Sequence, residues 1–189
     1  MTPEEAVYLD YIHKPLNRRV NMTLANYLYT LVYSDTYDEI KWQMWAQKLL
    51  LDAEYDDNTE WVYDVFFANN KQKLFDAIAE RMICENYLNF NNFTLTEIIQ
   101  GYYYCQYLSN EIGLYELLEK SGDVADAGQD SMGCEFFYQL LNMIDKSSDI
   151  INSREFIDKI TNYFTPLSIA AMEQKRSLET AIVGDLILV

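Results

Sequence analysis

Apolar residues recur every three or four positions along most of the chain, which is the spacing of an amphipathic α-helix. The clearest run lies between about residues 36 and 54, where six apolar side chains share one stripe: Trp42, Trp45, Ala46, Leu49, Leu50 and Ala53. Apolar pairs recur in the same way within 71–84, 136–144 and 156–164. Apart from the last four residues, no useful stretch has the two-residue alternation of a strand. The pattern therefore predicts helices.

Polar residues suited to helix ends precede several of these runs. Thr94 and Glu97 have the spacing of a capping box and predict a helix start. Three further cap residues are Asn70, Ser153 and Thr165, the last followed by Pro166 at what we expect to be a first helical position. These signals divide the chain into about eight to ten helices.

We therefore predict an all-α fold, either an irregular multi-helix bundle or a short stack of helical hairpins. The length of 189 residues suits one domain spanning 1–189. Residues 121–133 are rich in Gly, Asp and Ser, and there we expect a loop that marks an internal boundary.

The chain has 30 acidic and 14 basic residues, giving a net charge of −16. In successive blocks of 63 residues, acidic residues outnumber basic ones by six, six and four, so the charge is spread along the chain. Phosphate backbones and anionic membranes both require basic patches. The charge therefore argues against nucleic acids and membranes as partners.

Cysteine usage and the first residues predict a cytoplasmic protein. The three cysteines, Cys84, Cys105 and Cys134, are odd in number and widely spaced, and we expect buried, reduced thiols. Residues 1–5 are acidic where a secretion signal would be basic, and no apolar run approaches the length of a membrane helix. We expect no cofactor.

Two short motifs near the N-terminal third carry little chemistry. Asp10 and His13 lie three residues apart, but His13 is the only histidine, and we expect it to lie at a helix end. Asp56, Asp57 and Glu60 resemble the acidic Mg²⁺ motif of terpenoid synthases. The chain is much shorter than those enzymes and lacks a basic diphosphate clamp, so a helix cap is the simpler interpretation.

Two carboxylate pairs, Glu116 with Glu119 and Glu155 with Asp158, each lie on one helical face. Together they resemble the metal-binding pattern of all-α nucleotide pyrophosphatases, although in that family the two motifs are closer in sequence. This alternative, a Mg²⁺-dependent enzyme, requires all four carboxylates to converge in one pocket.

Tyrosine is abundant, with 16 residues. Tyr102, Tyr103 and Tyr104 are consecutive and would spread over about 200° of a helix, so we expect at least one at the surface near Tyr107. Exposed tyrosine suits recognition surfaces. A first candidate binding patch consists of Tyr102, Tyr103, Tyr107, Glu97 and Glu111. A second consists of Asp52, Glu54, Asp56, Asp57 and Glu60.

In charge, helicity and tyrosine content, the chain resembles small acidic helical immunity proteins that neutralise bacterial toxins. The resemblance implies a non-catalytic domain that occludes a basic protein, such as a toxin nuclease, and it assigns no individual binding residue. Complementary charge would speed the encounter with such a partner. A helical scaffold or regulatory subunit with a partner of ordinary charge is a further alternative.

Overall fold

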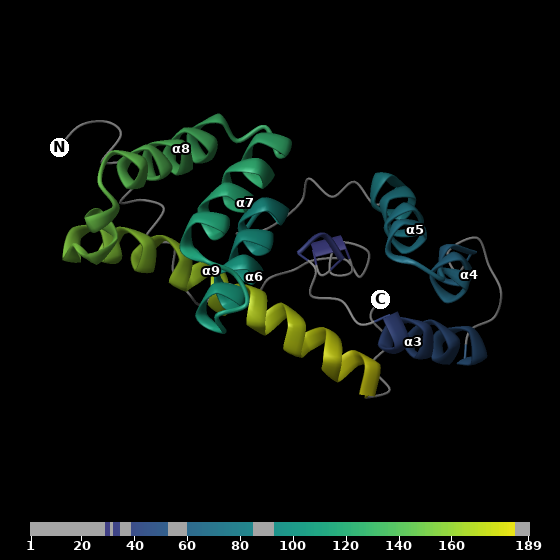
Figure 1. Ribbon diagram of the computed structural model, residues 1–189. Coiled ribbons are helices and arrows are strands. Elements are labelled where there is room, and N and C mark those ends of the chain that lie inside the picture. The colour runs from purple at the N-terminus through teal and green to yellow at the C-terminus, as the bar shows by residue number, and fades with distance from the viewer. Residues whose placement is uncertain (1–28, 31, 35–38, 53–59, 85–92, 184–189) are drawn as a thin grey trace. The chain divides into compact units, whose positions relative to one another are not determined.

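The computed structural model describes residues 29–30, 32–34, 39–52, 60–84 and 93–183 (Figure 1). In this part of the chain the structure is helical, with no strand. The elements in order are α3 (Glu39–Asp52), α4 (Glu60–Phe67), α5 (Lys71–Cys84), α6 (Leu95–Leu108), α7 (Leu114–Ala127), α8 (Ser131–Lys146), the 3₁₀ helix η1 (Ser148–Asn152) and α9 (Arg154–Val183). The all-α prediction is confirmed, although these ranges hold seven α-helices and not eight to ten.

The chain divides into two compact units. Unit 1 consists of residues 1–20 and 91–173, and unit 2 of residues 21–90 and 174–189, so α9 contributes to both. Our expectation of a single domain stays a prediction.

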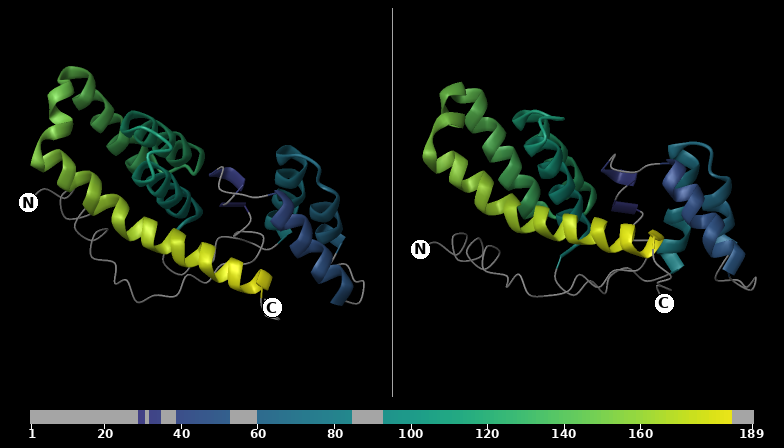
Figure 2. Two further views of the ribbon diagram at one scale, coloured as in Figure 1. Left: turned by 60° about the horizontal axis from the view of Figure 1, so that its bottom comes forward. Right: turned by 90° about the horizontal axis from the view of Figure 1, so that it is seen from below.

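Unit 1 is built around a core of aromatic and aliphatic side chains. In Figure 2, α6, α7 and α8 lie alongside the first half of α9. Phe137 from α8 and Phe164 from α9 are fully buried, and their ring centroids are 5.8 Å apart. Leu117 and Leu118 supply the fully buried face of α7. Burial of such side chains drives the helices of unit 1 together.

The helix α6 lies at the centre of unit 1. Eight consecutive residues, Glu97 to Tyr104, are buried, so this stretch has no outward face. On one side, Gly101 brings α6 so close to α9 that an added Cβ would collide with the Leu167 carbonyl and lie 3.0 Å from the Ala171 Cβ. The Tyr104 ring stacks on Phe164 at 5.1 Å. Close backbone approach explains why glycine, a poor helix former, occupies position 101.

A polar contact crosses this apolar core. Gln100 is fully buried, and its side-chain amide donates to the Ser121 carbonyl of α7 at 3.1 Å. Its amide oxygen accepts from the Tyr163 hydroxyl of α9 at 3.0 Å. Both ends of the Gln100 amide are therefore hydrogen-bonded, as burial requires.

The predicted cap residues are confirmed at three helices. At α6, the Glu97 amide donates to the Thr94 hydroxyl at 3.1 Å, and the Thr94 amide donates to the Glu97 carboxylate at 2.6 Å. Asn70 caps α5 through the Lys73 amide. Ser153 caps α9 through the Phe156 amide. Each cap satisfies a backbone donor that the helix itself leaves unpaired.

The prediction that Pro166 begins a helix is wrong, because Pro166 lies inside α9. The Thr165 hydroxyl donates back to the Thr161 carbonyl and does not cap a new helix. The apolar stripe runs through this point, with Phe164 and Leu167 both buried. A proline inside a helix costs about 3 kcal/mol, and the continuous burial on either side offsets it.

The predicted loop over residues 121–133 is also wrong. Helix α7 continues to Ala127, α8 begins at Ser131, and only residues 128–130 connect them. Gly122 lies inside α7, where an added Cβ would make an ordinary 3.5 Å contact with Phe137. Asp130 caps α8 by accepting from the Gly133 amide at 3.0 Å. Buried side chains on either side outweigh the loop-forming composition of the stretch.

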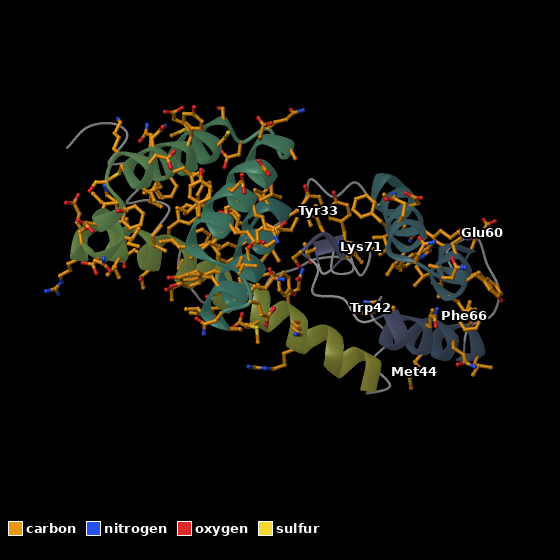
Figure 3. The ribbon with its side chains drawn as sticks, in the orientation of Figure 1. Tyr33, Trp42, Met44, Glu60, Phe66 and Lys71 are labelled. Carbon is orange, nitrogen blue, oxygen red and sulfur yellow. The ribbon has the colours of Figure 1, made fainter. Side chains whose placement is uncertain are left out.

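In unit 2, α3 and α5 confirm the helices predicted near 36–54 and over 71–84. Trp42 and Ala46 of the predicted stripe are buried. The Gln43 side chain donates to the Ala68 carbonyl at 3.2 Å and so joins α3 to the end of α4. Figure 3 shows Met44 pointing outward from α3, consistent with its exposed fraction of 63%.

The start of the described chain also belongs to unit 2. The Thr30 hydroxyl donates to the Gln174 side chain of α9 at 2.9 Å. Tyr29 and Tyr33 stack at 5.8 Å, and both rings lie near Phe75 of α5. No helix within the described ranges has the length and apolar character needed to cross a membrane.

Candidate binding surface

The first candidate patch from the sequence does not form a surface. Tyr102 and Tyr103 are 1% and 5% exposed, and Tyr104 is also buried, so the expectation that one of the three reaches the surface is wrong. Glu97 is buried and engaged in the capping box. Of this patch, Glu111 is exposed, and Tyr107 is half-buried against Tyr104. The prediction holds for a surface helix with one apolar face, whereas α6 is buried around its whole circumference over residues 97–104.

The second candidate patch lies mostly outside the described residues. Asp52 is the last residue of α3, and Glu60 is the exposed first residue of α4. Glu54, Asp56 and Asp57 fall between the described ranges. Asp10 and His13 also lie outside the described residues, before the first range. The second patch therefore stays a prediction.

The expectation of buried thiols is wrong for two cysteines. Cys105 and Cys134 are both partly exposed. Cys105 comes directly after the buried stretch of α6, and Cys134 lies in the first turn of α8, where the residues are exposed or half-buried.

The carboxylates of the enzyme alternative do not converge. Glu116 pairs with Lys120 at 3.0 Å, Glu155 with Lys159 at 3.5 Å, and Asp158 with Arg154 at 3.8 Å, each within its own helix. Glu119 is exposed as well. Across the described ranges, no group of three or more potential ligands is placed to hold a metal ion. The pocket that this alternative requires is not formed by these residues.

The same region carries a different arrangement, a row of carboxylates on the outer side of α7. Glu116, Glu119, Asp123 and Asp126 follow the spacing i, i+3, i+7, i+10 and are all exposed. We call these four residues the acidic face of α7. They lie opposite the buried side of the helix, which carries Leu117, Leu118, Ser121, Val124 and Ala125.

One basic side chain, Lys120, lies on α7. Its ammonium pairs with Glu116 and lies 5.6 Å from the centre of the Tyr103 ring. Glu119, Asp123 and Asp126 have no ion-pair partner among the described residues. Residues 91–173 hold 13 acidic and 4 basic residues, so the surroundings reinforce the negative potential.

An exposed aromatic ring lies beside these carboxylates. Tyr115 is 48% exposed and precedes Glu119 by one helical turn. The candidate binding surface therefore consists of Tyr115 and the acidic face of α7. The acidic spacing over 116–126 is visible in the sequence, but the loop expected over 121–133 places Asp123 and Asp126 outside the helix that carries Glu116 and Glu119.

No protein family, curated protein or solved structure matches the chain. The surface is therefore interpreted from its own geometry and charge.

Proposed function

We propose that this chain is a non-catalytic protein-binding domain whose acidic face on α7 binds a cationic partner protein. In this proposal the domain acts as an immunity or inhibitor protein and occludes a positively charged site, such as the phosphate-binding site of a toxin nuclease. The observation that carries the proposal is the row of exposed carboxylates beside Tyr115, three of which have no ion pair among the described residues.

The spacing of the row suits a site that grips phosphates. Ten residues of α-helix span about 15 Å, so the four carboxylates are spaced roughly 5 Å apart along the helix axis. Successive phosphates of one nucleic-acid strand rise by about 3.4 Å. A row of negative charge on this scale can occupy a basic groove in place of nucleic acid.

Tyr115 supplies the contact that charge alone lacks. Charge complementarity mainly accelerates encounter and selects the partner. A tyrosine ring offers a large contact area with few rotatable bonds and a polar tip. Part-exposed Cys134 lies outside any disulfide, and we infer a reducing, cytoplasmic compartment.

The proposal is tested with the full chain and the partner recovered from its own cells. The partner's sequence gives its pI, which we expect to be basic. The dissociation constant is then measured against NaCl concentration for the wild type and for E119K/D123K/D126K. We expect charge reversal to weaken binding by about 100-fold or more and to flatten the salt dependence.

A matched control carries the same change in net charge elsewhere in unit 1. The variant E135K/D145K/D149K reverses three exposed carboxylates of α8 and η1. We expect it to weaken binding far less than the α7 variant. An acidic partner, or an equal loss of affinity in both variants, would refute the proposed role of α7.

A further inference from the structure

A shallow hollow of about 560 Å³ lies between α4 and α5, within unit 2. Asp64, Phe67 and Ala68 line it from the side of α4, and Lys73, Asp76, Ala77 and Ala79 line it from α5. The three residues on the side of α4 follow the spacing i, i+3, i+4, as do the first three on α5, so each set lies on one helical face.

The chemistry of the lining separates into an apolar base and a charged rim. Ala68 and Ala77 are buried, with exposed fractions of 4% and 7%. Asp64, Lys73 and Asp76 are exposed. A ligand that fits this lining combines an apolar stem with a charged head.

Phe67 is the most exposed of the large aromatic side chains in the described ranges, at 69%. Its ring meets Phe66 edge-on, with centroids 5.0 Å apart. A phenylalanine has no polar tip that would favour this exposure. A flat cation that stacks on the Phe67 ring would cover this exposed surface.

Among the described residues, the charges of the lining sum to −1, from two carboxylates and one ammonium. Asp76 already accepts from the Gln72 side chain at 2.8 Å, whereas Asp64 has no such contact among the described residues. Residues 39–52 and 60–84 together hold six acidic and five basic residues. The helices α3, α4 and α5 are therefore close to neutral, and among them the lining of the hollow supplies a local negative charge.

We propose that the hollow receives a single arginine side chain from the cationic partner, as a second contact in addition to the acidic face of α7. The identity of that partner rests on the proposed function. The arginine stem lies on Ala68 and Ala77, the guanidinium stacks on Phe67, and its N–H groups donate to Asp64 and Asp76. One positive charge neutralises the lining, and the ammonium of Lys73 disfavours the binding of a second cation. Lysine fits less well because its ammonium neither stacks nor donates in a planar fork.

The test uses the ¹⁵N-labelled full chain and needs no partner. The protein is titrated separately with the N-acetyl amides of arginine, lysine and norleucine, and amide shifts are followed by NMR. We expect saturable shifts confined to residues 64–79, with arginine binding about 5-fold or more tightly than lysine. The variant D64N/D76N should weaken the arginine amide by a similar factor, while the matched variant D123N/D126N on α7 should leave it unchanged.

Several results would overturn the inference. These are equal shifts from norleucine and arginine, arginine shifts spread equally over the acidic face of α7, or no saturable shift at 64–79. Spectra of both variants report whether the fold is retained. If the hollow does not bind arginine, the proposed function is unaffected. If charge reversal on α7 leaves the affinity for the partner unchanged, the proposed function is refuted, and the preference of the hollow for arginine can still be measured.

Discussion

Replacing Gly101 or Gly122 by alanine makes the same chemical change in two helices of unit 1, and we expect opposite effects on stability. In a helix interior, alanine is favoured over glycine by about 1 kcal/mol. At Gly122 the new methyl group meets Phe137 at an ordinary contact distance of 3.5 Å. Gly122→Ala should therefore raise the free energy of unfolding by about 0.5–1 kcal/mol.

At Gly101 the new methyl group would overlap the carbonyl of Leu167, which is backbone and cannot rotate away. The helices α6 and α9 must then separate. Overpacking of a core typically costs about 1–3 kcal/mol, and contact with backbone places this case at the upper end. After subtraction of the gain in helix propensity, Gly101→Ala should lower the free energy of unfolding by about 2 kcal/mol.

Urea unfolding followed by far-UV circular dichroism measures both effects. With a slope of about 2 kcal/mol per molar urea, the midpoint should fall by about 1 M for Gly101→Ala and rise by about 0.3–0.5 M for Gly122→Ala. Tryptophan fluorescence is unsuitable, because Trp42, Trp45 and Trp61 all belong to unit 2. Equal stabilisation by the two substitutions would refute the close approach of α6 to α9.

Three further predictions concern the core and α9 and use the same urea assay. Gln100→Leu should lower the free energy of unfolding by about 2 kcal/mol, because the Tyr163 hydroxyl loses its acceptor. Adding Tyr163→Phe should recover part of that loss, and additive losses in the double variant would contradict the contact. Ser121→Ala should be neutral or stabilising by up to about 1 kcal/mol, because the buried hydroxyl has no hydrogen-bond partner among the described residues, and a clear loss of stability would disprove this. Pro166→Ala should stabilise the protein by about 1–3 kcal/mol, since it restores a helical N–H inside α9, whereas destabilisation would show that α9 depends on the proline.

Much of the fold could be predicted because local chemistry and packing agree. The spacing of residues alone predicts the cap at Thr94 and the helices near 36–54 and over 71–84, and α6, α3 and α5 confirm them. At Pro166 and over 121–127, local signals predicted a start and a loop where the structure has continuous helix. There, burial against neighbouring helices outweighs local propensity, and a single sequence does not show which neighbours those are.

The candidate site, like the fold, could be predicted only in part. Its acidic and aromatic character could be predicted from charge and tyrosine content, but its position could not. Tyr102 and Tyr103 are buried on a helix that packs against both α7 and α9, which is a property of tertiary packing. Tyr115, Asp123 and Asp126 share a face only because α7 continues through Gly122.

The complete burial of residues 97–104 also shapes how this protein can change over evolution. A helix at a surface accepts most substitutions on its outer side, so mutational tolerance rises and falls with each turn. Within α6 this periodic variation should be absent, and eight successive positions should all be intolerant of substitution. New binding specificities would then arise on α7 and α8, whose outer sides are free to vary, while the tyrosines of α6 persist because the core needs their volume.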